Sequence, residues 1–287
     1  MKKLTLLLLL LSFTCFGQVK PVKKTITTNG TTIQYWEFGK QTSTKMPVII
    51  FTHGIGAKSS IDAVLNEGLA KSLMNGLDIP FIVVAPWSFS GWFDPKIYID
   101  PLVQYYSHLP NVDPERIYYS GLSSGGNGVY RYLTSGYDGI AAYVPISINS
   151  NSFTPVNNKN RPVWHFHGAR DVDPNKVATS EGFIKKYNAV YPGKAQRTVF
   201  TNRSHDSWTT VYNNVLTETT SAGDTTLYHP FDKTIYEWML QYTLNPVVEP
   251  PTLPTVYLKM DSVIVEGTRA WTTATDGKVY SWSITQE

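Results

Sequence analysis

Residues 116–130 read RIYYSGLSSGGNGVY, an apolar run that stops in a cluster of glycines and serines before a helix-like stretch. A strand that merely ends needs one turn residue, whereas residues 121–125, GLSSG, fit the pattern G-x-S-x-G in the strand-to-helix context that the pattern requires. The register selects Ser123, because Ser124 has a leucine rather than a glycine two places before it. An ordinary glycine-rich turn is the alternative, but the context favours a nucleophile elbow with Ser123 as the nucleophile.

The pattern has a physical rationale. An elbow forces its serine into a strained turn, and glycines two before and two after it keep the neighbouring backbone free of Cβ clashes. The N-terminus of the following helix directs amide dipoles towards charge that develops near the serine.

Strand-like and helix-like stretches alternate around the elbow. The apolar runs typical of strands buried on both faces are 47–54, 81–87, 116–121, 140–148, 162–168 and 197–202. The helix-like stretches are 59–76, 124–135, 175–190 and 232–240. An alternating segment around Asn29 and Gly30 predicts a type I′ hairpin. We therefore expect an α/β fold with a mostly parallel central sheet and helices on both faces.

Two candidate partners follow Ser123 in the order Ser, Asp, His that this architecture uses. Asp171 lies in the loop after a buried strand and His205 in the loop after the last one, so both reach the edge where open α/β sheets place their sites. His205 would accept the Ser123 proton, and Asp171 would fix the histidine tautomer and stabilise the imidazolium. Asp173 is the rival acid and His229 the rival base.

An oxyanion hole for acyl transfer needs two backbone N–H groups. We expect one from Ser124, directly after the nucleophile, and the other from Ile55 in the segment FTHGIG at 51–56. His53 is expected to order this loop through a hydrogen bond.

Three motifs together resemble those of the α/β-hydrolase superfamily: the elbow in NVDPERIYYSGLSSGGNG (111–128), the acid in HGARD (167–171) and the histidine in SHDSWTTVY (204–212). The nearer resemblance is to secreted carboxylesterases and peptidases related to polyhydroxybutyrate depolymerases and to feruloyl and acetylxylan esterases. It extends over residues 25–243 and departs at Ser124, where relatives often carry methionine. The resemblance implies an α/β-hydrolase fold and ester hydrolysis through an acyl-enzyme.

Composition divides the chain into segments. Residues 1–17 combine two lysines with an apolar run shorter than the roughly 20 residues that span a bilayer, which predicts a secretory signal peptide. Cys15 would instead anchor a lipoprotein, although the residues before it fit a lipobox poorly. Residues 18–244 would form the catalytic domain, residues 245–254 a proline-rich linker, and residues 255–287 a short β-rich segment.

His165 and His167 lie two apart on a predicted strand and so share a face, which could begin a metal site. Ala169 and Arg170 stand where a metallo-β-lactamase-like pattern would have Asp and His. We therefore expect no metal and no cofactor, with His167 packed at the strand end and His165 hydrogen-bonded in the core.

The segment 86–106 reads as a loop rich in aromatic side chains. Trp87 and Trp92 are candidates for a substrate-binding platform, and the other aromatic residues are expected in the core. Trp208 is expected beside the loop of His205.

Composition limits the classes of function. The chain has 287 residues, 42% of them hydrophobic and 16% charged, with a net charge of +3, which suits one sizeable core and gives no basic field for nucleic acid. The gap at 149–160 is too short and polar for an inserted lid domain. No integral membrane span is expected in the mature protein.

The resulting prediction is a secreted or periplasmic serine hydrolase that cleaves small-molecule or polymeric carboxylic esters, including esters on a polysaccharide. A serine peptidase with the same triad is one alternative, because ester and amide hydrolysis use the same nucleophile and oxyanion hole. A catalytically inactive binding or adhesion protein is the other.

Overall fold

The chain forms two compact units, Met1–Asn245 and Pro246–Glu287. A computed structural model describes residues 20–28, 30–39, 44–135, 138–148, 160–171, 174–221, 228–245, 264–266, 269–273 and 279–283. The predicted signal peptide and residues 246–254 of the predicted linker lie outside the described residues.

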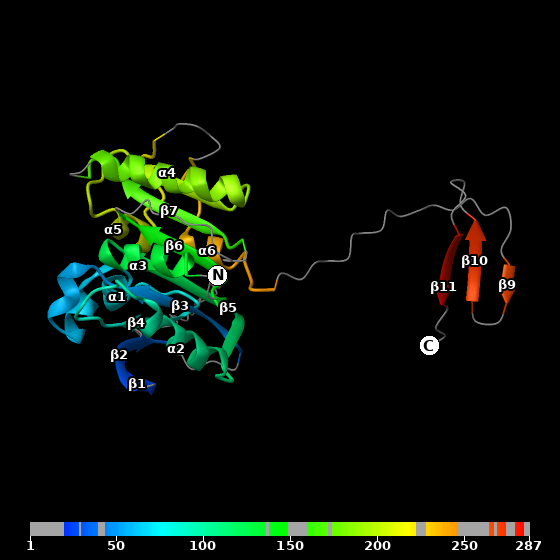
Figure 1. The fold of residues 1–287 in the computed structure, drawn as a ribbon, viewed down its shortest axis with the longest axis horizontal. Helices are drawn as coiled ribbons and strands as arrows, with labels where there is room; N and C mark the ends of the chain where they lie inside the picture. Colours follow the sequence, from blue (N-terminus) through cyan, green and yellow to red (C-terminus); the bar gives the residue numbers. More distant parts are fainter. Residues whose placement is uncertain are drawn as a thin grey trace, which may run out of the picture. The chain divides into compact units, whose positions relative to one another are not determined.

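The first unit is built on an eight-stranded sheet with the strand order β1-β2-β4-β3-β5-β6-β7-β8 (Figure 1). Its strands are β1 (Val22–Thr28), β2 (Thr31–Phe38), β3 (Met46–Thr52), β4 (Ile82–Pro86), β5 (Val112–Leu122), β6 (Ala142–Ile146), β7 (Val163–Gly168) and β8 (Ala195–Phe200). β2 pairs antiparallel with β1 and β4, and the remaining neighbours are parallel. The prediction of a mostly parallel sheet is confirmed, and the hairpin predicted around Gly30 joins β1 to β2.

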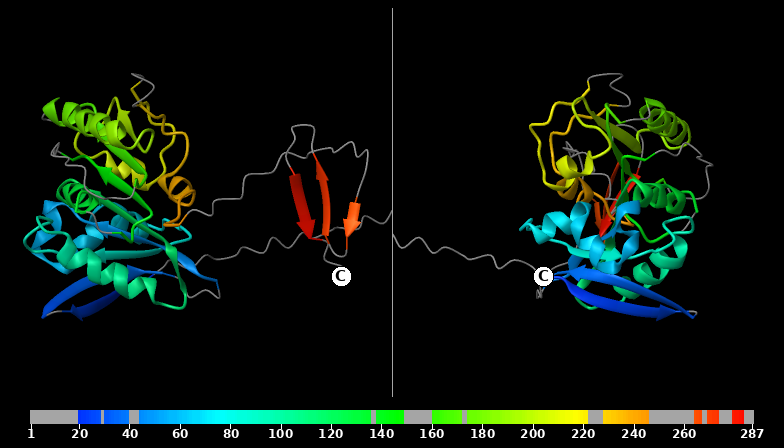
Figure 2. Two further views of the ribbon diagram at one scale, coloured as in Figure 1. Left: turned by 45° about the vertical axis from the view of Figure 1, so that its right-hand side comes forward. Right: turned by 90° about the vertical axis from the view of Figure 1, so that its left-hand side faces the viewer.

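Helices cover both faces of this sheet (Figure 2). The helical segments are the 3-10 helices η1 (Ile55–Ser59) and η2 (Ile61–Asn66), and α1 (Gly68–Met74), α2 (Lys96–Ser107), α3 (Ser124–Leu133), α4 (Pro174–Val190), α5 (Trp208–Tyr212) and α6 (Ile235–Met239). One buried apolar cluster joins α2, α3 and α4 to one face, and a second joins α1, α5 and α6 to the other.

The central strand β3 shows how the sequence produces two cores. Val48 and Ile50 belong to the first cluster. Ile49 and Phe51 belong to the second. Successive side chains of a strand point to opposite faces, so a continuous apolar run serves both clusters at once.

Helix α2 corrects the prediction of a loop over 86–106. The helix contains Pro101, which in a sequence suggests a break because proline has no N–H to donate. Its buried residues nevertheless recur at helical spacing: Ile99, Leu102, Val103 and Tyr106. The helix predicted over 59–76 is likewise replaced by η1, η2 and the shorter α1. Among the described residues, no helix has both the length and the hydrophobicity to cross a membrane.

The carboxyl ends of the parallel strands lie at one edge of the sheet and position the candidate site. β5 leads into Ser123, β7 into the loop of Asp171, and β8 into the loop of His205. The described residues contain no inserted lid domain, and residues 149–159 of the β6–β7 connection lie outside them.

The second unit contains a three-stranded antiparallel sheet. Its strands are β9 (Ile264–Glu266), β10 (Arg269–Thr273) and β11 (Val279–Ser283), with β10 in the centre. These strands lie within residues 255–287, where short strands were predicted.

Candidate active site

Ser123 is the single residue between β5 and α3. Its backbone has φ 51° and ψ −117°, a left-handed conformation that is strained for a residue with a side chain. The Ser123 N–H donates to the carbonyl of Ile146 on the neighbouring strand at 2.9 Å, which holds the turn in place. This is the strained turn that the G-x-S-x-G motif predicts.

Gly125 allows the end of β3 to pack against the start of α3. A Cβ on Gly125 would lie 2.6 Å from the carbonyl oxygen of His53 and closer still to that of Thr52. Both obstacles are backbone atoms, so a larger residue would displace the strand end or the helix. A Cβ on the next loop residue, Gly54, would lie 3.6 Å from the Cβ of Ser123, so the close packing brings this loop beside the candidate nucleophile.

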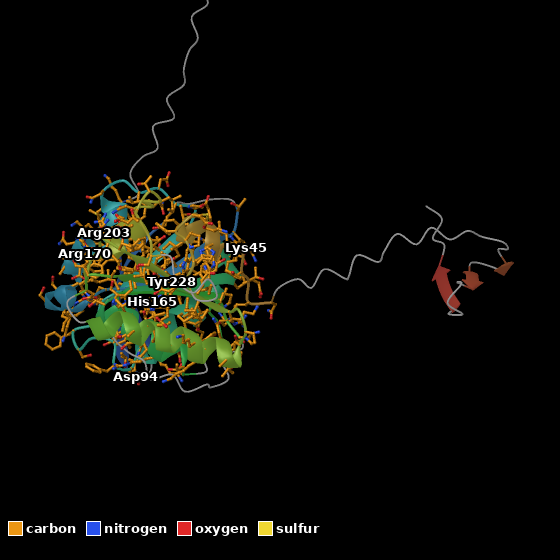
Figure 3. The ribbon with its side chains drawn as sticks, turned by 90° about the horizontal axis from the view of Figure 1, so that it is seen from above. Lys45, Asp94, His165, Arg170, Arg203 and Tyr228 are labelled. Atoms are coloured by element: carbon orange, nitrogen blue, oxygen red, sulfur yellow. The ribbon has the colours of Figure 1, made fainter. Side chains whose placement is uncertain are left out.

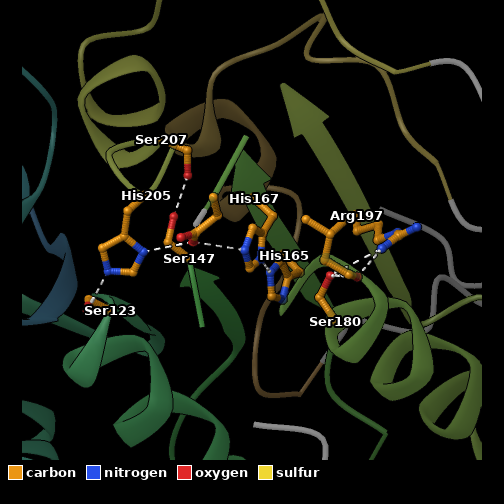
Figure 4. A network of polar contacts seen from close by, with 10 residues as sticks. Ser123, Ser147, His165, His167, Ser180, Arg197, His205 and Ser207 are labelled. Atoms are coloured by element: carbon orange, nitrogen blue, oxygen red, sulfur yellow. Dashed lines mark hydrogen bonds and ion pairs between the residues drawn. The ribbon is translucent and has the colours of Figure 1, made fainter. Parts of the chain in front are cut away.

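The structure brings Ser123, His205 and Asp171 together (Figure 4). The Oγ of Ser123 lies 2.9 Å from Nε2 of His205, and Nδ1 of His205 lies 2.8 Å from Oδ2 of Asp171. The Asp171 side chain is buried, whereas His205 is partly exposed at the carboxyl edge of the sheet. In this arrangement the serine hydroxyl donates to one histidine nitrogen, and the other nitrogen donates to the carboxylate.

The two loops that carry Asp171 and His205 are joined through their backbones. The N–H of Ala169 donates to the carbonyl of Phe200 at 2.9 Å, and that of Arg170 donates to the carbonyl of Arg203 at 2.8 Å. Figure 3 shows Arg170 and Arg203 as neighbours at one side of the molecule. A Cβ on Gly168 would overlap the backbone of Arg203. The glycine of the HGARD motif is therefore needed for the two loops to meet.

Further contacts hold the His205 loop from its other side. The N–H of Ser207 donates to the His205 carbonyl at 2.9 Å, and the hydroxyls of Ser207 and Ser147 hydrogen-bond at 2.7 Å. Ser147 follows β6 and, like Ser123, has a positive φ, of 51°. The ring of Trp208 meets that of His205 edge-on with centroids 5.3 Å apart, as expected from its place in the sequence. Sequence reasoning did not identify the contact between Ser147 and Ser207.

The loop that carries Ile55 is positioned by a partly buried glutamate. Glu67 accepts a hydrogen bond from the N–H of Gly54 at 2.8 Å, so this N–H is engaged within the protein. Burial raises the pKa of Glu67 above its usual value, although the Gly54 hydrogen bond opposes this shift. Ile55 begins η1 and Ser124 begins α3, and the first N–H groups of a helix have no acceptor within it. Both predicted oxyanion donors therefore stand at helix starts on the edge where Ser123 lies.

His53 orders the same loop, as predicted. Its Nδ1 lies 2.6 Å from the carbonyl of Gly54, and the N–H of Ser88 donates to its Nε2 at 3.1 Å. This pairing requires a neutral ring with the proton on Nδ1. Burial lowers the pKa of His53 to about 4, in agreement with a neutral ring.

The predicted substrate platform needs a correction at Trp92. This side chain is only 1% exposed, donates to the carbonyl of His53 at 2.8 Å and packs edge-on against the His53 ring. Trp92 therefore supports the loop and offers no face to a substrate. Trp87 is partly buried and donates to the carbonyl of Ala57 at 3.2 Å, which ties it to η1.

The expectation that Phe89 and Phe93 lie in the core is wrong. They are 71% and 77% exposed rather than core residues. A Cβ on Gly91 would lie 3.6 Å from Oγ of Ser124 and 4.0 Å from the Phe93 ring, which sets this segment beside the elbow. Ile55, 68% exposed, adds a third apolar side chain. We call Ile55, Phe89 and Phe93 the apolar rim.

Of the two rival residues, only the base His229 lies in the part of the chain that is described. His229 faces the carbonyl of Pro230 and packs on Trp164, and Asp173 lies outside the described residues. No group of three or more histidine, cysteine, aspartate or glutamate side chains among the described residues is arranged to hold a metal ion. His165 and His167 do share a face, as predicted, and their rings stack with centroids 5.5 Å apart.

The chain is similar to known proteins in part of its sequence and in its fold. No family model matches the chain. A bifunctional acetylxylan esterase/xylanase of Neocallimastix patriciarum is 28% identical over 130 residues, which cover 42% of this chain and 19% of that protein. The chain thus matches less than a fifth of the length of this curated relative.

Solved structures give a wider match. A thermostable esterase superposes with a TM-score of 0.56 and 21% identity, covering 78% of this chain and 63% of that chain. A feruloyl esterase module from Clostridium thermocellum, complexed with sinapinate, gives a TM-score of 0.51 and 18% identity, covering 69% of this chain and 86% of that chain. The sheet, its helices and these matches show that the chain has the α/β-hydrolase fold.

Proposed function

We propose that this chain is a serine carboxylesterase in which Ser123 is the nucleophile, His205 the general base and acid, and Asp171 the acid that orients His205. The proposal is carried by one observation. A continuous row of hydrogen bonds, 2.9 Å from Ser123 to His205 and 2.8 Å from His205 to Asp171, ends on a serine held in a strained elbow. The sequence match to an esterase-containing enzyme supports the same class of reaction.

The geometry supports a two-step reaction. Ser123 Oγ attacks the acyl carbonyl while His205 Nε2 takes its proton, and the imidazolium then protonates the departing alkoxide. The resulting acyl-enzyme is cleaved by water, which His205 activates in the same way. Asp171 stays ionised throughout and stabilises the imidazolium.

The tetrahedral intermediate in each step carries a negative oxygen. We assign its stabilisation to the N–H groups of Ile55 and Ser124. Glu67 supports this assignment because it occupies the N–H of Gly54, which leaves Ile55 as the next donor along the loop. Fixed backbone donors need no reorganisation when the charge develops, which is why they stabilise the transition state effectively.

The substrate class follows from the surroundings of Ser123. Among the described residues there is no lid, and the apolar rim is exposed beside the elbow. Such a site suits a short or aromatic acyl group on a bulky alcohol better than a long fatty chain, which needs an enclosed apolar channel to bury roughly 0.8 kcal/mol per CH₂. We therefore propose polysaccharide-linked acetyl or hydroxycinnamoyl esters as substrates, which agrees with the names of the relative and of the feruloyl esterase module.

A polymeric substrate outside the cell would require export. The predicted signal peptide at residues 1–17 supports a secreted or periplasmic location, with a lipoprotein anchor at Cys15 as the alternative.

The test is a substrate panel. Purified protein would be assayed on acetyl and feruloyl esters, on p-nitrophenyl esters with acyl chains of two to sixteen carbons, and on peptides. We expect hydrolysis of short and aromatic esters without activation at the emulsion threshold, and covalent labelling of Ser123 by a fluorophosphonate. Cleavage of peptides in preference to esters would favour the peptidase. A protein that is folded yet neither labelled nor active would favour a binding protein.

A further inference from the structure

The carboxylate of Asp171 has a second histidine partner on the core side, His167, which Figure 4 shows between His205 and His165. Oδ2 of Asp171 lies 2.8 Å from Nδ1 of His205 and 3.2 Å from Nε2 of His167. His167 is the first residue of the HGARD motif and is completely buried, so it cannot contact a substrate. The proposed reaction leaves this residue without a role.

The contacts continue beyond His167. Nδ1 of His167 lies 3.3 Å from Nε2 of His165, and Nδ1 of His165 lies 3.1 Å from the hydroxyl of Tyr130 on α3. Both histidines and Tyr130 are buried. A row of hydrogen bonds therefore connects α3, through two residues of β7, to the candidate acid.

The protons in this row have only one consistent arrangement. An ionised carboxylate accepts hydrogen bonds and donates none, so the nitrogen of His167 that faces Asp171 carries a proton. A neutral imidazole has one N–H, which makes Nδ1 of His167 an acceptor, and His165 must then donate from Nε2. Nδ1 of His165 in turn accepts from the hydroxyl of Tyr130. Every donor points towards Asp171.

The surroundings keep both histidines neutral. Burial lowers the pKa of His167 to about 4, although Asp171 opposes this shift. Burial lowers the pKa of His165 well below its usual value, and the positive charge of Arg197 on β8 acts in the same direction. The charged or titratable groups that act on His167 are Asp171, His165, His205 and Arg197, and Arg197 is paired with Glu181 at 2.7 Å.

We propose that His167 is a positioning residue for the triad. It donates a hydrogen bond to Asp171 from the core side, and His165 and Tyr130 hold it in the tautomer that can donate. Two N–H groups on one oxygen fix the carboxylate in the direction of His205 and stabilise its ionised form. This inference rests on the proposed function, because it concerns the same acid.

The first experiment determines the tautomers of His165 and His167 directly and does not depend on enzymatic activity. In ¹⁵N-labelled wild-type protein at pH 7, long-range ¹H–¹⁵N correlation spectra should show His167 and His165 neutral with the proton on Nε2. The variant His167→Gln assigns the His167 signals by their loss. A His167 that carries its proton on Nδ1 would overturn the inference, whatever the enzyme hydrolyses.

The second experiment compares two substitutions. His167→Leu removes the donor at similar size, whereas the side-chain amide of His167→Gln can still donate to Asp171. Since a hydrogen bond to a charged group has been lost, kcat for His167→Leu should fall roughly 10- to 100-fold with little change in KM. The acidic limb of its pH profile should move to higher pH, because a carboxylate with one donor fewer binds the His205 imidazolium more tightly. His167→Gln should keep most of kcat and the wild-type limb.

The control is His229→Leu, which removes a histidine that packs on Trp164 away from this row and should behave as wild type. The inference fails if His167→Leu and His167→Gln have equal kcat and equal pH profiles, or if both lose activity only in proportion to a lower Tm. If the wild type hydrolyses no ester at all, the proposed function fails, and the tautomer spectra still decide the hydrogen-bonded row on its own.

Discussion

The two sides of His205 differ in their surroundings. On the core side, Asp171 and His167 are buried, and each has hydrogen-bonding partners of its own. On the open side, the apolar rim exposes most of its surface to solvent. The buried side can hold charges and tautomers constant from one substrate to the next, whereas the rim can adapt to different acyl groups. Substitutions on the two sides should therefore have different kinetic consequences.

The largest effect is expected at Ser123, the candidate nucleophile. Ser123→Ala removes the nucleophile and should lower kcat by a factor of up to about 10⁶, since the remaining triad cannot form an acyl-enzyme. Steady-state assays on a p-nitrophenyl ester check this, with Ser107→Ala on α2 as a control that keeps wild-type activity. A Ser123→Ala protein with more than a tenth of the wild-type rate would rule out the assigned nucleophile.

The next effect tests the buried side. Asp171→Asn keeps the shape of the acid but favours the wrong His205 tautomer, so kcat should fall by roughly 10⁴ while KM changes little. Circular dichroism establishes that the variant is folded, and Asp62→Asn, an exposed acid, is the matched control. A benign Asp171→Asn together with a damaging Asp173→Asn would transfer the role to the rival acid.

The stability of the fold should depend on pH through three buried histidines. Burial lowers the pKa of His53 and that of His167 to about 4 from 6.5, and it lowers the pKa of His165 well below its usual value. Between pH 6.5 and 4 the unfolded chain binds protons that the folded chain does not, so the free energy of unfolding falls as the pH falls. The slope is about 1.4 kcal/mol per pH unit for each histidine that differs by a full proton.

Urea titrations of the wild type and His53→Gln at pH 7, 5.5 and 4.5 measure this slope. The variant cannot titrate at position 53, so its stability should decline less steeply. Identical slopes for the two proteins would mean that His53 is protonated in the folded state as readily as in the unfolded chain.

The smallest effect is expected at the apolar rim. Phe89→Ala and Phe93→Ala remove contacts with an aromatic acyl group that are worth roughly 0.5–1.5 kcal/mol each, so KM for a feruloyl ester should rise about 2- to 10-fold. The acetyl ester should be affected less, and kcat should be nearly unchanged for both. Val190→Ala, another exposed apolar residue, serves as the control. A loss of kcat that is equal for the two esters would show that these phenylalanines stabilise the elbow and do not bind the acyl group.

Much of the fold and the arrangement of the candidate triad could be predicted because both depend on local constraints. Gly125 must be glycine because backbone atoms of β3 lie where its Cβ would be, and such a requirement is visible in a motif. Continuous apolar runs such as residues 47–54 identify buried parallel strands for a similar reason. The roles of Ser123, Asp171 and His205 remain predictions for the assays above.

The predictions that were wrong or incomplete concern features that depend on contacts between residues far apart in the sequence. Residues 86–106 were predicted to form a loop, yet the buried stripe of α2 packs on the sheet and a helix that contains Pro101 forms. Aromatic composition suggested that Phe89 and Phe93 are buried, because it cannot tell which side of a loop meets solvent. The alternation of His165 and His167 showed a shared face, but not that Asp171 lies at one end of the row and Tyr130 at the other.

The backbone pairing between the Asp171 and His205 loops has a consequence for their motion. The amide protons of Ala169 and Arg170 are bonded to the carbonyls of Phe200, the last residue of β8, and of Arg203 in the loop that follows. They exchange with solvent deuterium only when these backbone hydrogen bonds open. The exchange rates of these two amides therefore report how often the backbones beside Asp171 and His205 separate in a resting molecule, with no substrate present.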